Sequence, residues 1–391
     1  MLFQILDDKK ECTAIYHDGQ LKDGHDLSSM THTWAPSIFF DDTKECAHIW
    51  CEGKSLDQAC PDELRDHWAE LNRKAKAYLN SFLQAKINLN DVCFYDLVPK
   101  SFLLEFYEIK SQICQSVFEN FKRPLNYEFL YDLSIYLKKI ESRHLNLNIQ
   151  SLDMSDSKVR RNISKVKNCN SNISYDLWTT STGRLTTKKN SFPILTLNKE
   201  LRTVLRPTND LFVELDYNAA ELRVLFALLG QSQPEEDIHS WISDHIFENK
   251  YDREQTKKKV FSWLYNPKAK NKKLNEYLNR EEVYRKYYKD ECLDTPYDRN
   301  LAAPPEKAVN FLIQSTTSDL FLTSAMKIDK MLKTKKSFTA FCIHDSLVLD
   351  IAKEDKGELQ SLIEAFSLTK FGKFKTNVSV GKDFGSMRKI S

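Results

Sequence analysis

The hydrophobic pattern changes its period several times along the chain. Residues 1–60 contain short alternating segments, one of them "CAHIWCEG", and turn residues such as "HDGQ", which together predict short strands. From residue 61 to 150 the apolar positions recur every three or four residues, which predicts helices. Residues 151–180 are polar and rich in Asn and Ser, which indicates a loop or a contact surface.

The stretch "LFVELDYNAAELRVLFALLG", residues 211–230, begins as a strand and ends as a helix. The first part alternates, the second is rich in Ala and Leu, and Gly230 is a natural stop for a helix. Asp216 falls at the end of the strand and Glu221 one turn into the helix. Taken alone, this pattern is typical of an Asp that caps a helix and binds no ligand.

The last third of the chain predicts a second acidic strand end. Residues 237–290 are helical and basic, and a long helix follows the prolines at 304 and 305. The segment "SFTAFCIHDSLVLDI" predicts two strands with a turn that carries Asp345. If these strands lie beside the strand that ends at Asp216, two carboxylates converge. Such a pair repels unless cations neutralise it, and oxygen-ligand Mg²⁺ sites in nucleotidyl transfer are built in this way.

Composition limits the class of protein. The chain has 391 residues, 41% of them hydrophobic and 29% charged, as in ordinary globular proteins. No apolar stretch is long enough to cross a bilayer, and the N-terminus lacks a signal-peptide pattern, so we expect a cytoplasmic protein without a membrane partner. The nine cysteines are expected to be free thiols, and the spacing of those near residues 46–60 matches no standard zinc pattern.

Charge is uneven along the chain although the net charge is only +2. Residues 251–290 carry twelve Lys and Arg against six acids, and residues 158–189 carry eight against one. Such segments fit phosphate backbones, and they also fit a solvated surface.

Four residues spaced four apart form a stripe along one predicted helix: Arg253, Lys257, Phe261 and Tyr265. The stripe is cationic at its start and aromatic at its end, as a nucleoside triphosphate carries phosphates at one end and a flat base at the other. An amphipathic core helix with a basic end explains the stripe equally well.

Other candidates lie near these segments. His239 begins a helix and could contact phosphate, and Arg184 lies in the small-residue loop "TGRLTT", where it could contact a nucleic-acid backbone. Asn310 and Gln314 share one face of the long helix, where buried amides reach a base edge or satisfy one another.

Together and in this order, these segments resemble the family A DNA polymerases, the class of bacterial DNA polymerase I. "TGRLTT", "DYNAAELR", "DIH", the stripe and "HDS" are similar to successive motifs of that family over residues 175–391. The resemblance implies two Mg²⁺ ions held by Asp216 and Asp345, and a catalytic Lys257. It also implies that substrates are bound by Arg253, His239, Phe261, Tyr265 and Glu221. It implies that nucleic acid is bound by Arg184, Asn310, Gln314 and His344.

The resemblance also implies an α+β right-hand polymerase fold with an antiparallel-sheet palm and helical fingers and thumb. We expect a small β-rich region without exonuclease motifs, a thumb, a first palm segment, fingers and a second palm segment. Their bounds are 1–60, 61–150, 151–230, 231–300 and 301–391.

The chain departs from the family at several positions. Ser346 stands where an acid usually follows the Asp of the last motif, and Asn266 stands where Gly usually closes the helical motif. Glu306 replaces an Arg, and the fingers region is short.

The sequence therefore predicts a template-directed DNA polymerase that extends a primer with dNTPs and has no proofreading exonuclease of its own. Primer–template DNA and dNTPs are the expected partners, and a separate exonuclease or other replisome proteins are further candidates. The small size and the Lys- and Asn-rich composition suggest a phage or another mobile replicon, and hence a host cytoplasm. Two alternatives are a phage-type single-subunit RNA polymerase, whose last motif often reads His-Asp-Ser, and an accessory protein that binds primer–template without chemistry.

Overall fold

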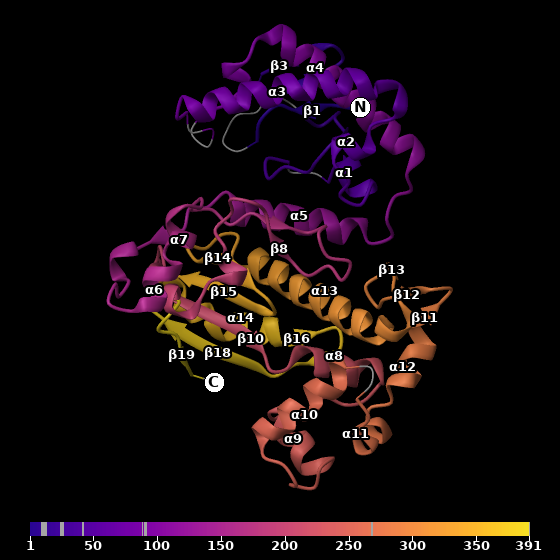
Figure 1. Ribbon diagram of the computed structural model, residues 1–391, viewed down its shortest axis with the longest axis vertical. Helices are drawn as coiled ribbons and strands as arrows, with labels where there is room; N and C mark the ends of the chain where they lie inside the picture. The colour runs from indigo at the N-terminus through magenta and orange to yellow at the C-terminus, as the bar shows by residue number, and fades with distance from the viewer. Residues whose placement is uncertain are drawn as a thin grey trace. The chain divides into compact units, whose positions relative to one another are not determined.

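The computed structural model describes residues 1–8, 14–23, 27–40, 43–87, 89, 92–266 and 269–390. The chain combines helices and sheets in two compact units, Met1–Ser142 and Arg143–Ser391 (Figure 1). This composition confirms the predicted α+β class. Within the described residues, no helix has both the length and the apolar character that crossing a bilayer requires.

Short strands open the first unit, as the alternating pattern predicts. The strands β1 (Gln4–Ile5), β2 (Ile15–His17) and β3 (Gln20–Lys22) form an antiparallel sheet, and β4 (His32–Thr33) pairs in parallel with β5 (Glu45–Cys46). The strand predicted over "CAHIWCEG" is wrong beyond Cys46, because α1 (Ala47–Trp50) follows, and α2 (Leu56–Ala59) is also helical. A short apolar run with Ala47 and Ile49 buried fits a buried helix as well as a strand.

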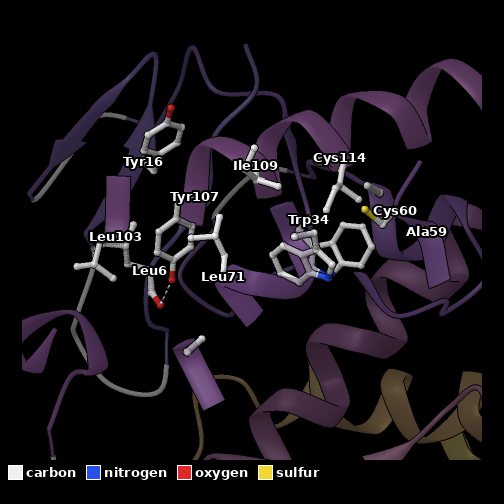
Figure 2. Close-up of a cluster of buried hydrophobic side chains, with 14 of the residues drawn as sticks. Leu6, Tyr16, Trp34, Ala59, Cys60, Leu71, Leu103, Tyr107, Ile109 and Cys114 are labelled. Atoms are coloured by element: carbon white, nitrogen blue, oxygen red, sulfur yellow. Dashed lines mark hydrogen bonds between the residues drawn. The ribbon is translucent and has the colours of Figure 1, made fainter. Parts of the chain in front are cut away.

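Helices make up the rest of this unit, as the three-to-four-residue period predicts. They are η1 (Asp62–Leu64), α3 (Arg65–Gln84), η2 (Phe94–Leu97), α4 (Lys100–Asn120) and α5 (Tyr127–Glu141). One hydrophobic core joins Leu6 and Tyr16 to Leu71 of α3 and Leu103 of α4 (Figure 2). The Tyr107 hydroxyl donates to the Leu6 carbonyl at 2.9 Å. Residues 1–60 therefore share their core with the helices that follow them.

The cysteines of the described residues are mostly reduced. Seven are free thiols: Cys46, Cys51, Cys60, Cys114, Cys169, Cys292 and Cys342. Cys93 is disulfide-bonded, so the expectation of free thiols throughout the chain is wrong at that position.

A five-stranded antiparallel sheet forms the centre of the second unit (Figure 1). Its order is β14 (Phe338–Ile343), β15 (Ser346–Ile351), β10 (Leu211–Tyr217), β18 (Thr376–Gly381) and β19 (Arg388–Lys389). Around it lie α8 (Ala220–Leu228), α13 (Ala308–Met331) and α14 (Leu359–Ser367). The Tyr217 hydroxyl hydrogen-bonds to Ser324 of α13 and to the Phe366 carbonyl of α14, so these helices cover one face of β10.

The alternation along β10 assigns its side chains to two faces. Val213, Leu215 and Tyr217 belong to the helix-covered face and are almost fully buried. Glu214 and Asp216 point from the opposite face and are half-buried. The predicted strand, turn and helix over residues 211–230 are confirmed, and Gly230 ends the helix with a left-handed φ of +69°.

A helical and small-sheet region interrupts this unit between β10 and β14. It contains α9 (Ile238–His245), α10 (Arg253–Tyr265), α11 (Lys272–Tyr277), α12 (Arg280–Tyr287), β11 (Tyr288–Lys289), β12 (Cys292–Asp294) and β13 (Asn300–Ala302). Trp263 fixes the C-terminal turn of α10, because its indole donates to Asn275 at 2.7 Å while Arg280 donates to its carbonyl at 2.7 Å.

The polar segment 151–180 is more ordered than predicted. It contains α6 (Ser157–Asn162) and α7 (Ser164–Lys167), which bury Val159 and Val166, so the loop prediction is wrong there. Asp156 caps α6 by accepting from the Lys158 amide. Short elements complete the unit: β6 (Asn146–Leu147), η3 (Ile149–Ser151), β7 (Tyr175–Asp176), β8 (Thr186–Thr187), η4 (Ile194–Thr196), η5 (Lys199–Val204), β9 (Leu205–Arg206), η6 (Pro305–Lys307), η7 (Lys353–Glu358), β16 (Leu368–Thr369) and β17 (Gly372–Lys373).

Candidate functional site

The strand pairing brings the two predicted metal-binding acids together. Strands β10 and β15 are antiparallel neighbours, with Asp216 directly opposite Ser346. Asp345 precedes Ser346 in the tight turn between β14 and β15, where His344 has a left-handed φ of +56°. The condition that these strands are neighbours is therefore met, and both acids lie at one end of the sheet.

The electrostatics of Asp216 reflect this proximity. Burial raises the pKa of Asp216 to about 6, and the charges of Asp345 and Glu214 add to the shift. A hydrogen bond from the Asn377 amide at 3.0 Å and the charge of Lys389 oppose it. Burial also raises the pKa of Asp345. A site with this excess of buried negative charge favours a cation.

The raised pKa predicts a stability change without any substrate. Because the pKa of Asp216 is higher in the folded chain, its ionisation destabilises the fold above about pH 6 and has no cost below about pH 4. In EDTA at pH 8, Asp216→Asn should therefore raise the free energy of unfolding by roughly 1–3 kcal/mol. Urea unfolding across pH 4–8 measures this, and the gap should close towards pH 4. A gap independent of pH would contradict the assignment.

A cavity of about 370 Å³ opens beside the acidic pair. It is bounded by the loop at 184–185, α8, α10, α13 and the β14–β15 turn. Six of the candidate residues line it: Arg184, Glu221, Phe261, Tyr265, His344 and Asp345. The walls therefore combine an apolar floor, stacked aromatic rings and both signs of charge, as a site for a small polar ligand requires.

Glu221 and Arg184 form an ion pair at this cavity, through Oε1 and Nη2. The Glu221 side chain is only 14% exposed, whereas that of Arg184 is 50% exposed. Burial raises the pKa of Glu221, the Arg184 charge lowers it, and the Asp345 charge raises it again. Arg184 therefore compensates a carboxylate that lies close to a second acid.

The backbone around Arg184 is held by three contacts. Ser318 donates to the Gly183 carbonyl and Thr180 donates to the Arg184 carbonyl, both at 2.8 Å. The Arg299 guanidinium packs against Gly183 so closely that a Cβ there would meet it at 2.7 Å. Since Gly183 also has a φ of +71°, only glycine fits this position without strain.

The stripe predicted on residues 253–265 is present on α10. Arg253 and Lys257 are exposed at its N-terminal half, and Phe261 and Tyr265 stack with their ring centroids 5.7 Å apart. The Lys257 ammonium lies 6.0 Å from the Phe261 centroid. Phe261 is 39% exposed and borders the cavity, so part of the ring is accessible to a ligand.

Arg253 and His239 are more constrained than the sequence indicates. Arg253 binds Asp237 through two nitrogens, at 2.8 and 3.0 Å. Burial would raise the pKa of Asp237, but hydrogen bonds from Arg253 and Asn218 outweigh it and lower the pKa. His239 is 2% exposed, and burial lowers its pKa to about 4. At neutral pH a phosphate would therefore meet a neutral imidazole rather than a cation.

The two amides of α13 lie along one face of that helix. The Asn310 amide contacts the Tyr265 carbonyl at the end of α10, at 3.5 Å. Gln314 lies one turn further on and one turn before Ser318, which lines the cavity. Both residues are half-buried, and their predicted roles stay predictions.

No group of three or more His, Cys, Asp or Glu side chains is arranged to hold a metal ion within the described residues. A pair of carboxylates can still hold Mg²⁺, because this ion keeps several water ligands and also binds phosphate oxygens of the substrate. The donor chemistry of Asp216 and Asp345 is therefore compatible with Mg²⁺.

Two arginines of the site region, one fully buried and one 14% exposed, have no signal in the local sequence pattern. Arg299 pairs with the fully buried Asp319 at 2.7 and 3.1 Å, and Arg223, also fully buried, donates to the carbonyls of Asn218, Pro234 and Glu236. Each joins segments from different elements, so its role depends on tertiary structure.

Comparison with known proteins finds likeness in structure but none in sequence. No family model matches the chain, and no curated protein sequence matches it. Among solved structures, the chain is similar to the POL domain of Pol1 from M. smegmatis, described in complex with DNA primer-template and dNTP. The TM-score is 0.46 at 15% sequence identity, and the match covers 85% of this chain and 66% of the other, just under two thirds. The function proposed below therefore rests on the residues of this chain.

Proposed function

We propose that this chain is a template-directed DNA polymerase that adds dNTPs to a primer 3′ end. The observation that carries the proposal is the convergence on one cavity of Asp345, the acidic Glu221 and the aromatic end of the α10 stripe, with Asp216 on the neighbouring strand. An acidic end suits cations and phosphates, and an aromatic wall suits a base. Segments far apart in the sequence supply these parts.

In the proposed reaction the primer 3′-hydroxyl attacks the α-phosphorus of a dNTP. The new P–O bond forms as the bond to pyrophosphate breaks, and the hydroxyl proton leaves to solvent. Asp216 and Asp345 would hold two Mg²⁺ ions, which when bound activate the hydroxyl and neutralise charge on the phosphates. Lys257 would bind the triphosphate and donate a proton to the leaving pyrophosphate. Phe261 would stack on the incoming base, and Tyr265 would border the template side.

The remaining candidates would bind and orient substrates. Arg253 and a neutral His239 would complete the triphosphate site, and Arg184, Asn310, Gln314 and His344 would contact the primer–template. The two basic segments, 158–189 and 251–290, would add contacts to phosphate backbones and make binding salt-dependent.

Primer extension with separate dNTP and rNTP pools tests the proposal. The purified chain should extend a primer with dNTPs in Mg²⁺ and should leave a mismatched primer end untrimmed. Extension mainly with rNTPs would instead indicate a polymerase of the RNA class. Binding of primer–template without extension in Mg²⁺ or Mn²⁺ would indicate an accessory protein.

Glu221 is expected to exclude ribonucleotides by occupying the space of a 2′-hydroxyl. Its side chain, only 14% exposed, lines the cavity one turn after the β10 strand, and Arg184 forms an ion pair with it there. Glu221→Ala should raise incorporation of rNTP relative to dNTP by at least roughly tenfold, about 1.4 kcal/mol of lost discrimination. The ratio of kcat/KM for the two sugars measures this, and an unchanged ratio would retire the steric role.

Lys257 is expected to stabilise charge that develops on the phosphates. Lys257→Ala should raise KM for dNTP and lower kcat, with a combined loss of roughly 10²-fold. Lys258→Ala is the matched control, because Lys258 is exposed on the same helix one residue further on and is not part of the stripe. Equal effects of the two substitutions would mean that α10 contributes only general positive charge.

A further inference from the structure

Glu214 is an acid of the site region that the proposed reaction does not use. It lies two residues before Asp216 on β10, so both side chains point from the same face of the sheet. Its neighbours across the strands are Val348 on β15 and Ser379 on β18.

A hydrogen bond ties Glu214 to the turn that carries the second acid. The Ser346 hydroxyl donates to Glu214 Oε1 at 2.7 Å. Ser346 follows Asp345 directly, lies opposite Asp216 and is 5% exposed. The same short serine therefore contacts Glu214 while it adjoins both proposed metal ligands.

The pairing register explains why a serine suits this position. Ser346 and Glu214 are diagonal neighbours on the β10–β15 pair, a spacing that a long side chain spans and two short ones do not. An acid at 346 would face Glu214 and Asp216 at once, and three carboxylates would then crowd one short stretch of the ladder. Ser346 instead leaves two carboxylates at this point, those of Glu214 and Asp216, and both come from β10.

The opposite side of β10 supplies the compensating groups. Asn377 on β18 donates to Asp216 at 3.0 Å and accepts from Lys389 at 2.9 Å. Asp216 therefore lies between an amide supported by a cation and the acid Glu214. Without the Glu214 carboxylate, less negative charge near Asp216 would offset the positive charge of Lys389.

We propose that Glu214 is a positioning residue of the metal site, whose carboxylate, oriented by Ser346, adds the negative charge that draws divalent cations to Asp216 and Asp345. This inference rests on the proposed function, since it assumes that those two acids hold the ions. Glu214 acts through the field at the site and through the Ser346 contact, and it need not touch an ion.

Mn²⁺ binding to the full chain without DNA or nucleotide tests the proposal. Electron paramagnetic resonance counts free Mn²⁺, and the binding that Asp345→Asn removes is assigned to the site. Glu214→Gln should weaken this binding by roughly tenfold, the lower end for residues that support a metal ligand. Glu235→Gln is the matched control, because Glu235 is an exposed acid of the same unit, and it should leave binding unchanged. Unchanged binding in Glu214→Gln would overturn the proposal.

An exchange of the two side chains separates charge from local structure. Glu214→Ser should weaken Mn²⁺ binding as Glu214→Gln does, and the double variant Glu214→Ser/Ser346→Glu should regain binding to within about threefold of the parent, because the carboxylate returns on the neighbouring strand. Failure of the folded double variant to recover would overturn the role of the charge.

The readout also separates this inference from the proposed function. A chain that binds Mn²⁺ in a Glu214-dependent manner but never extends a primer would refute only the polymerase. A chain that extends a primer while Glu214→Gln binds Mn²⁺ normally would refute only the role of Glu214.

Discussion

Asp345→Asn is expected to abolish nucleotide incorporation, with a loss of at least roughly 10³-fold in kcat, and Asp216→Asn should do the same. Two-metal chemistry stabilises several kcal/mol of transition-state charge, and an amide in place of either carboxylate removes a ligand and a negative charge together. Both acids lie at the same end of the sheet, on paired strand ends. Single-turnover incorporation of one dNTP measures the effect.

Asp244→Asn is the matched control, because Asp244 is an exposed acid on α9 that does not line the cavity. It should incorporate dNTP at the rate of the parent. All three variants should bind primer–template and keep the circular dichroism spectrum of the parent. Incorporation by either site variant at near the parental rate would show that the two carboxylates do not hold the catalytic ions.

Arg299→Ala is expected to destabilise the fold by about 3–5 kcal/mol, because it leaves the Asp319 carboxylate buried without its partner. The Asp319 side chain is fully buried and that of Arg299 is 14% exposed. Burial raises the pKa of Asp319, and the Arg299 charge and hydrogen bonds oppose this. Urea unfolding monitored by circular dichroism measures the loss.

The substitution should also slow the reaction, because Arg299 packs on Gly183 beside Arg184. Arg285→Ala removes an arginine from an exposed pair with Glu281, 76% and 63% exposed, and should cost less than about 1 kcal/mol. Arg299→Ala/Asp319→Asn should recover part of the stability, since the buried charge is gone. A loss below about 1 kcal/mol for Arg299→Ala would mean that the pair contributes little.

The local pattern predicts the strand ends of the site but not what surrounds them. The strand at 211–217, the helix that Gly230 ends and the two strands at 338–351 follow from alternation and turn residues. The local pattern does not predict which of these strands are neighbours, because strand neighbours depend on tertiary contacts. In the structure the strands that carry Asp216 and Ser346 pair directly, with these two residues opposite each other.

Long-range contacts account for what the sequence leaves open. The protonation of His239 depends on burial, which no local spacing encodes, so the phosphate contact inferred from its position would involve a neutral imidazole at neutral pH. The same holds for Arg299, whose partner lies 20 residues away. The sequence pattern does not predict helices α6 and α7, because each has a single buried apolar residue, Val159 or Val166, among polar neighbours.

The division of the chain into compact units also depends on long-range contacts. Composition separates residues 1–60 from the helices that follow, but Leu6 and Tyr16 pack in one core with Leu71 and Leu103. In the sequence, the first compact unit ends at Ser142 and the second begins at Arg143, and the predicted boundaries at 60 and 150 stay predictions. The names thumb, palm and fingers for these segments stay predictions.

Single-nucleotide incorporation on four templates that differ only in the first unpaired base is the most direct test of the polymerase proposal. With each dNTP supplied alone in Mg²⁺, the purified chain should extend the primer only with the complementary nucleotide on each template. Asp345→Asn should give no product on any of them. Product that ignores the template base, or no product from the parent chain while it binds primer–template in Mg²⁺ and in Mn²⁺, would contradict a template-directed DNA polymerase.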